Sequence, residues 1–307
     1  MRTLASLSIL MIPRMLRPVL SLIAGSVFVT GLFAQAPAPK LEFPATSPAA
    51  TIKQRVGLTD IEINYSRPSM RGRKIFGALV PYGEVWRTGA NSATKVTLST
   101  AVKLNGTAVP AGTYALFTIP GQAEWTVIFN QVSGQWGSYA YDAKNDVARF
   151  TAKPIALNNP VETFGISISE LANDSAATLA LSWENTRVPM KVEVDVVGAL
   201  VPQIEAVMAS AEPKKPYFAS AMFYYENNLD LTKAVTWMDA GLAEQPNAFW
   251  MIYRKGLLLE KKGDKAGALA AAQKSLEAVR NAPADKTPES LKAEYVRLNE
   301  ALLARVK

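Results

Sequence analysis

The chain has 307 residues, of which 49% are hydrophobic and 19% charged, and its formal net charge is +7. It contains no histidine and no cysteine, which excludes a Ser-His-Asp triad, a cysteine nucleophile, a zinc site built from His or Cys, and any disulfide. Catalysis would have to use carboxylates, lysine, hydroxyl groups or tyrosine. Basic and acidic residues are nearly balanced after residue 36, so the charge does not favour a nucleic-acid partner.

The N-terminal segment has the layout of a secretory signal peptide. From Met15 a basic start is followed by an apolar run at residues 19–33 and by small residues that end at Ala36. The run is shorter than the roughly 20 residues that span a bilayer. We expect residues 1–36 to be a cleaved signal peptide, which places the protein in the periplasm or outside the cell with no transmembrane segment left. The sequence leaves Met1 and Met15 both open as the start.

The region from residue 49 to 197 has the pattern of a β-domain. It follows residues 37–48, which are rich in proline and alanine and predict an extended linker. Apolar residues then alternate with polar ones, as at Ile61, Ile63 and Tyr65, which is typical of strands with one buried face.

Turn residues divide this region into eight or nine strands. Asn105-Gly106 is a strong signal for a two-residue hairpin, Pro120-Gly121 precedes another strand, and Asn185-Thr186 is expected to separate two more. We therefore expect an antiparallel β-sandwich or a barrel-like domain.

The region from residue 198 to 307 has a helical period. Two segments align at a separation of 34 residues, which is the period of the tetratricopeptide repeat. The aligned pairs include Met222 with Gly256, Asp230 with Asp264, and Ala234 with Ala268. A last amphipathic helix is expected at residues 288–306. We predict a short, TPR-like helical domain completed by the helices on either side of the repeats.

One segment between predicted strands, Ser66–Lys95, is rich in arginine, aromatic residues and glycine. Arginine side chains can bind a carboxylate, a phosphate or sugar hydroxyls, while an aromatic ring supplies a stacking face and an amide fixes orientation. Alternatively, the arginines bind backbone carbonyls or acids and the rings close the open end of the sandwich. The candidate ligand-binding residues are Arg67, Arg73, Tyr82, Trp86, Arg87 and Asn91.

A second candidate surface follows the predicted strand that ends near Phe129. Its residues are Trp136, Tyr139, Tyr141 and Asp142. Such a cluster can form a carbohydrate platform or a weak Ca²⁺ site, but its acids lack the spacing of an EF-hand, and aromatic turns commonly pack over a sheet edge. We expect no metal site and no cofactor.

Four acids of the β region could pair as the acid and base of a hydrolase. They are Glu124, Asp142, Asp146 and Glu184. A glycan hydrolase needs two carboxylates at a defined separation, which sequence spacing does not reveal, so no catalytic residue is assigned.

Several long strings of the β region resemble the DUF2911 family (domain of unknown function 2911). They include SRPSMRGRKIFGALVPYGEVWRTGANSATK, PAGTYALFTIPG and LSWENTRVPM, and the resemblance runs from about residue 48 to 194. It implies an exported protein, and a helical-repeat tail is known in some members. The resemblance implies no reaction.

The sequence thus predicts a multidomain protein, mostly β and then α. The function we expect is that of a non-catalytic binding or scaffolding protein of the cell envelope. It would hold a polar or anionic ligand at the arginine-rich segment and contact a protein through its helical repeats. A carboxylate-dependent hydrolase and a purely structural module are the alternatives.

Overall fold

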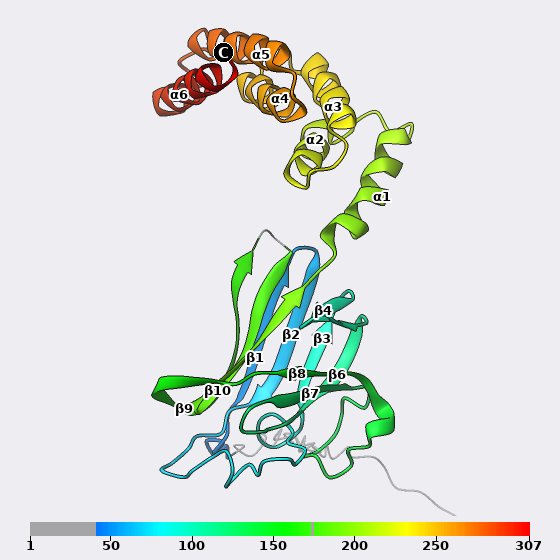
Figure 1. Cartoon of the computed structure of the whole chain (residues 1–307), viewed down its shortest axis with the longest axis vertical. Helices are drawn as coiled ribbons and strands as arrows, with labels where there is room; N and C mark the ends of the chain where they lie inside the picture. The colour runs from blue at the N-terminus through cyan, green and yellow to red at the C-terminus, as the bar shows by residue number, and fades with distance from the viewer. Residues whose placement is uncertain (1–40, 173–174) are drawn as a thin grey trace, which may run out of the picture. The chain divides into compact units, whose positions relative to one another are not determined.

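The computed structural model describes residues 41–172 and 175–307 (Figure 1). The expected signal peptide, 1–36, and the first four residues of the expected linker lie outside the described residues. Ten strands between Ala49 and Glu193 are followed by six α-helices between Val196 and Val306 in this part of the chain. The order of a β region and then a helical region is as predicted, and the strands number one or two more than expected.

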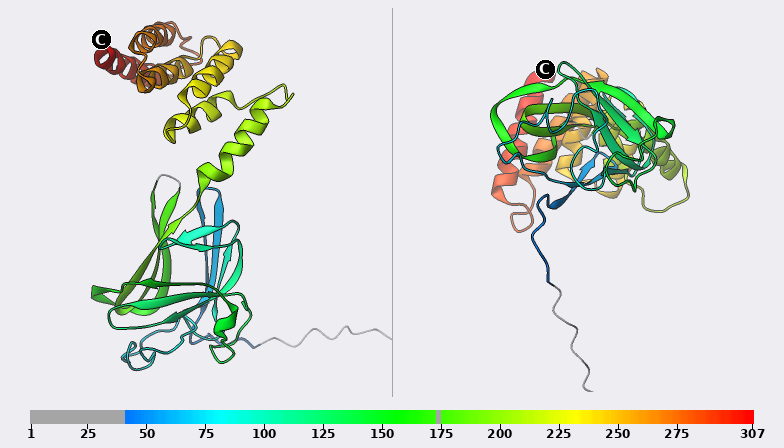
Figure 2. Two further views of the ribbon diagram at one scale, coloured as in Figure 1. Left: turned by 45° about the vertical axis from the view of Figure 1, so that its right-hand side comes forward. Right: turned by 90° about the horizontal axis from the view of Figure 1, so that it is seen from below.

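The strands form two antiparallel sheets, which are seen from two further sides in Figure 2. The larger sheet has the order β1-β2-β3-β6-β7-β8 and the smaller has the order β5-β4-β10-β9. The larger consists of β1 (Ala49–Val56), β2 (Thr59–Ser66), β3 (Thr94–Leu98), β6 (Gly112–Ile119), β7 (Trp125–Asn130) and β8 (Asp146–Ala152). The smaller consists of β4 (Val102–Leu104), β5 (Thr107–Val109), β9 (Ile155–Ala172) and β10 (Ala176–Glu193). The arrangement is sandwich-like and is not a closed barrel.

The alternation in sequence explains the core. In β2 the side chains of Ile61, Ile63 and Tyr65 are buried, and the residues between them face outward. One continuous apolar cluster takes residues from both sheets, including Trp125 and Trp183, which are each 2% exposed. The two inner faces therefore bury each other.

The hairpin predicted at Asn105-Gly106 is confirmed. It joins β4 to β5, and both residues have positive φ, 47° and 83°, as a type I′ turn requires.

The turn expected at Asn185-Thr186 is not present, because β10 runs through these residues without a break. The pairing of β10 with β9 shifts register on both sides of Glu184, whose φ is 53°. Between Ser182 and Thr186, β10 advances by four residues while its partners on β9 move by nine, from Gly165 to Ala156, so the extra residues of this irregularity lie on β9. The Glu184 carboxylate accepts hydrogen bonds from the backbone N–H groups of Ile75 and Phe76, at 3.4 and 3.3 Å. The polar residues that suggested a turn thus continue β10, opposite an irregular stretch of β9.

The helical region has the predicted repeat. Its helices are α1 (Val196–Ala209), α2 (Tyr217–Glu226), α3 (Leu231–Glu244), α4 (Phe249–Lys262), α5 (Lys265–Arg280) and α6 (Glu289–Val306). The helices α3 and α5 begin 34 residues apart, each after an aspartate whose side chain caps the helix. None of the helices in the described ranges is long and apolar enough to cross a membrane.

Gly256 shows why the repeat needs a small residue at this position. A Cβ there would lie 2.9 Å from Leu302 Cδ2 and 3.6 Å from Ala271 Cβ. The helices α4, α5 and α6 therefore approach closely, and the last helix covers the apolar face left by the second repeat.

Candidate functional site

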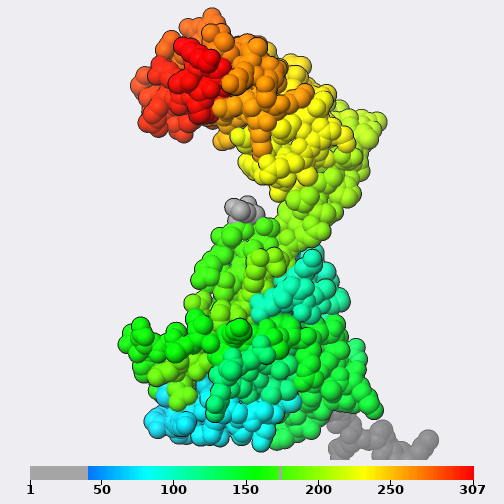
Figure 3. All heavy atoms as spheres, in the orientation of Figure 1, coloured from blue at the N-terminus to red at the C-terminus, as the bar shows by residue number. Residues whose placement is uncertain are grey.

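The arginine-rich loop between β2 and β3 covers one end of the sandwich, where Figure 3 shows its light-blue atoms. Its aromatic residues Phe76 and Trp86 are 5% and 8% exposed. Trp86 stacks on Trp183 with ring centroids 5.9 Å apart, and its indole N–H donates to the carbonyl oxygen of Gly89 at 3.1 Å. The Trp86 ring is thus part of the core.

Two of the three candidate arginines donate to backbone carbonyls. Arg67 Nε donates to the Phe164 carbonyl oxygen at 3.0 Å, which ties the loop to β9. Arg73 donates to the carbonyl oxygens of Met70 and Ser69, at 2.9 and 2.7 Å. For these two residues the contacts match the alternative given above, in which the arginines bind backbone carbonyls and stabilise the loop.

The third arginine, Arg87, differs from the other two. Its Nε is buried and has no hydrogen-bond acceptor, and within residues 41–172 and 175–307 it forms no ion pair. Trp86 pairs with Thr118 of β6 and points into the core. Alternation along the chain therefore places Arg87 on the outer face of the sheet, where its other neighbour, Val85, packs against the cluster that contains Phe117. Arg87 Nε is thus a buried donor with no acceptor among the described residues.

Tyr82 and Asn91 lie at the surface of the same loop. The Tyr82 ring is 41% exposed and lies so close to Gly77 that a Cβ there would be 2.6 Å from it. The Asn91 amide donates to Ser66 Oγ at 3.2 Å, and Asn91 has a φ of 60°.

The structure brings the two candidate segments of the sequence together. Ala93 N–H donates to the Gln135 carbonyl oxygen at 3.0 Å, and Gly137 N–H donates to the Asn91 carbonyl oxygen at 3.1 Å. Ser92 and Trp136 form an antiparallel bridge between these bonds. The end of the arginine-rich loop and the aromatic segment are thus paired side by side.

Two residues of the aromatic segment hold it in place. Tyr141 packs edge-on against Phe117 of the outer face, at 5.2 Å, and its hydroxyl donates to Asp146 Oδ2 at 2.7 Å. Burial and then this hydrogen bond raise the pKa of Tyr141 to about 12. Asp142 accepts from the N–H of Lys144 and begins a short 3₁₀ turn, η1 (Ala143–Asn145).

The other two residues of the segment are left at the surface. The Trp136 side chain is 66% exposed and the Tyr139 side chain 85% exposed. They are available for contact with a ligand or a partner.

A groove of about 330 Å³ lies beside this paired segment. Its walls come from residues of β1, β2 and β3, from Ser92 and Ala93 just before β3, and from Ser133 and Gly134, which precede Trp136 in the sequence. Its polar lining includes Thr51, Asn64, Ser92, Lys95 and Ser133. Lys95 is exposed and is the one charged residue in the lining.

Three of the four candidate carboxylates already have structural partners. Glu184 binds loop amides, Asp142 caps the 3₁₀ turn, and Asp146 accepts from Asn130 at 2.9 Å and from Tyr141. Glu124 is exposed. No group of three acidic side chains that could hold a metal ion occurs in the part of the chain that the structure describes.

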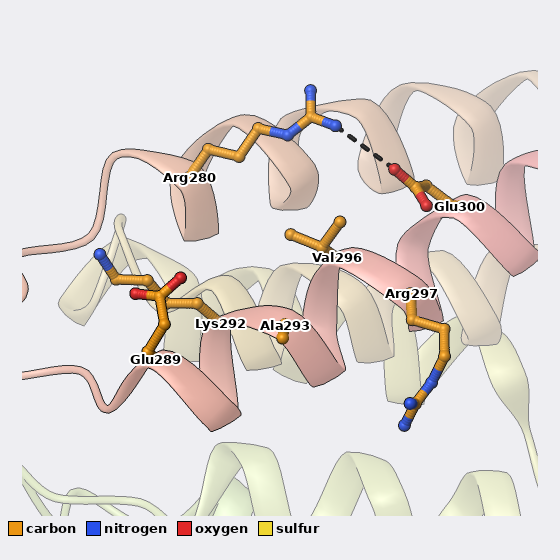
Figure 4. Close-up of a pocket in the computed structure, with 7 residues that line it drawn as sticks. All are labelled: Arg280, Glu289, Lys292, Ala293, Val296, Arg297 and Glu300. Atoms are coloured by element: carbon orange, nitrogen blue, oxygen red, sulfur yellow. Dashed lines mark hydrogen bonds and ion pairs between the residues drawn. The ribbon is translucent and has the colours of Figure 1, made fainter.

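The helical region carries another cavity, of about 440 Å³, between α5 and α6. Figure 4 shows Arg280 paired with Glu300 at 3.4 Å across it, while Arg297 points away from that pair. Its charges therefore do not converge on one point.

Sequence reasoning did not single out Lys95, Ser92 or Ser133. The outward position of Lys95 follows from the alternation in β3. The meeting of Ser92 with the segment at Ser133 depends on a tertiary contact that no local pattern encodes.

Together the fold and the site define a protein with a β-sandwich closed at one end by an arginine-rich loop and followed by helical repeats. Residues 47–192 match the family model described as "Protein of unknown function (DUF2911)", so the β-domain of this chain belongs to the DUF2911 family. The comparisons with curated proteins and with solved structures gave no match.

Proposed function

We propose that this chain is an exported, non-catalytic binding protein of the cell envelope that holds a small anion at Arg87. The observation that carries the proposal is the buried Nε of Arg87, which has no acceptor. A buried donor left unpaired costs about 1–3 kcal/mol. An anionic oxygen would remove this cost with a charge-assisted hydrogen bond.

The surroundings of Arg87 support its assignment over its neighbours. The donors of Arg67 and Arg73 named above are engaged by carbonyl oxygens. Arg87 is half-buried, so an anion bound there would be partly shielded from water and held more strongly than at an exposed arginine. The helical repeats would then attach the binding domain to a protein partner, since repeat arrays present extended surfaces.

Phosphate is the simplest probe of this proposal. Titration with inorganic phosphate should raise the melting temperature of the purified protein, because a ligand that binds only the folded state stabilises it. The Arg87→Met variant should keep its fold and lose the phosphate-dependent shift. Lys74→Met removes the same charge from an exposed position of the same loop and should keep the shift.

The proposal fails if phosphate and sulfate leave the melting temperature of the wild type unchanged. It also fails if Lys74→Met loses as much of the shift as Arg87→Met does, because the effect would then be one of net charge. Either result would favour the purely structural reading of the loop.

Export has its own test. The layout of residues 15–36 supports cleavage after Ala36. N-terminal sequencing of the protein recovered from the envelope fraction should begin at or within a few residues of Pro37. A mature chain that begins at Met1 or Met15 would contradict export with cleavage.

A further inference from the structure

The groove beside Lys95 is a second possible site on the outer face of the larger sheet, and the proposed role of Arg87 does not use it. We propose that this groove binds a single sugar ring that carries a carboxylate, as in a hexuronic acid. The inference goes beyond the anion site and does not depend on it. It rests on the size of the groove, on its one cation, on its hydroxyl groups and on an exposed indole at its rim.

The size and lining favour one hydroxyl-rich ring. A volume of about 330 Å³ is at the lower end of the range for small-molecule sites. The hydroxyl groups of Ser92 and Ser133 make no side-chain hydrogen bond to any described residue. Each can donate and accept, which matches the mixed donor and acceptor character of sugar hydroxyls.

Lys95 supplies the contact for a carboxylate. It lies opposite Asn64 in the pairing of β2 with β3. Glu62 lies within reach of the charge of Lys95, but its carboxylate is engaged by other groups, because it pairs with Lys53 at 3.0 Å and accepts from the Asn64 amide at 2.9 Å. Among the described residues Lys95 has no ion pair of its own. One free ammonium group suits one carboxylate.

Trp136 supplies an apolar face at the rim. Directly opposed residues of an antiparallel pair have Cβ atoms about 5 Å apart and point to the same side. Ser92 lines the groove and is bridged to Trp136, so the indole lies beside the groove wall. A ring that is 66% exposed can pack against the C–H face of a sugar without first being uncovered.

The test compares four probes by calorimetry and by tryptophan fluorescence on the full chain. They are glucuronate, glucose, acetate and a tetramer of galacturonate. Glucuronate should bind at least about tenfold more tightly than glucose or acetate, since it alone offers both the ring and the charge. The tetramer distinguishes a free sugar from a polysaccharide, because tighter binding of the tetramer than of glucuronate would mean that the groove takes one unit of a chain.

Variants assign the contacts. Lys95→Met should reduce the affinity for glucuronate about tenfold and leave glucose unchanged, whereas Lys153→Met, at another exposed position, should change neither. Trp136→Ala should weaken both sugars and abolish the fluorescence change. Arg87→Met should leave glucuronate binding intact, which separates this site from the anion site.

Two results would overturn the inference. One is equal binding of glucuronate and acetate, which would show that only the charge is recognised. The other is glucuronate binding that survives both Lys95→Met and Trp136→Ala but is lost in Arg87→Met. That second result would agree with an anion site at Arg87 and would show that the groove is not the glucuronate site.

Discussion

Arg67 and Arg87 belong to the same loop, and their different roles follow from what lies beside each. The carbonyl oxygen of Phe164, on β9, is 3.0 Å from Arg67 Nε. Arg87 follows Trp86 on a segment that pairs with β6, and its Nε is buried with no acceptor. One guanidinium therefore stabilises the fold, and the other has a buried donor without an acceptor among the described residues.

This difference gives a stability prediction. Arg67→Met should lower the free energy of unfolding by about 1–3 kcal/mol, because it removes a part-buried hydrogen bond between the loop and β9. Arg87→Met should not lower it and should raise it by up to about 1–3 kcal/mol, because no hydrogen bond is lost and the cost of the buried, unpaired Nε is removed. Urea titrations followed by intrinsic fluorescence measure both. A loss of several kcal/mol for Arg87→Met would show that Arg87 supports the fold and would remove it from the ligand site.

Tyr141 gives a second prediction at this scale, in alkaline solution. Its pKa is raised from 10.0 to about 12 by burial and by the hydrogen bond to Asp146. The folded protein thus holds the phenol proton more tightly than the unfolded chain does. The stability that this contributes is complete below pH 10 and is lost as the pH rises from about 10 to 12.

The Tyr141→Phe variant should therefore show a weaker fall in stability across that pH range. Denaturant midpoints at intervals between pH 9 and 12 would measure it. Tyr139→Phe is the matched control, because Tyr139 is 85% exposed in the same segment. Identical pH profiles for Tyr141→Phe and the wild type would contradict the prediction.

At the scale of elements, the periodicity of apolar residues predicted whether a segment is a strand or a helix, but it predicted the ends of strands less well. The 34-residue period predicted the helices α2 to α5, because each repeat must place its small residues where helices cross, as at Gly256. The signal at Asn185-Thr186 was misread because these polar residues continue β10 opposite an irregular stretch of β9. The loop amides that Glu184 binds come from a distant part of the sequence, so no local pattern distinguishes this arrangement from a turn.

The contact between α4 and α6 gives a pH prediction for the helical region. Arg305 donates two hydrogen bonds to the Glu260 carboxylate, at 2.9 and 3.0 Å. These bonds hold the pKa of Glu260 below its usual 4.5. A lowered pKa in the folded state means that the stabilisation is present above about pH 4.5 and is lost as the pH falls below it.

Glu260→Gln should therefore cost more stability at pH 7 than at pH 3. The cost should be below about 1 kcal/mol, because the two side chains are 29% and 51% exposed and water screens the pair. Circular dichroism at 222 nm during urea titration at both pH values measures it. An equal effect at the two pH values would mean that the substitution acts by packing and not through charge.

For the whole molecule, the sequence predicted the β-then-α order and named candidate site residues, but it did not predict how those residues are brought together. Alternation and repeat period are local signals, so they carried the β-then-α order. The assembly of the site depends on Ser92 meeting Trp136, which lie far apart in the sequence. The acceptors of Arg67 and Arg73 could not be predicted from the sequence either, because they are backbone carbonyl oxygens, which every residue has.

The last prediction concerns the independence of the two regions. The apolar clusters of the strand region and of the helical region share no residue in the described part of the chain. Residues 41–195 should therefore fold alone, with a strand-type far-ultraviolet spectrum and a near-ultraviolet signal from the packed rings of Trp86, Trp125 and Trp183. Residues 196–307 should be helical and less stable, because two repeats and their flanking helices bury little surface.

The measurement is a urea titration of each part and of the full chain. If the regions are independent, the fluorescence transition of residues 41–195 should coincide with the matching transition of the full chain, within about 0.5 kcal/mol. Aggregation of residues 41–195 under conditions in which the full chain stays soluble would contradict this. It would mean that the helices bury apolar surface of the sandwich, and that the two regions form one folding unit.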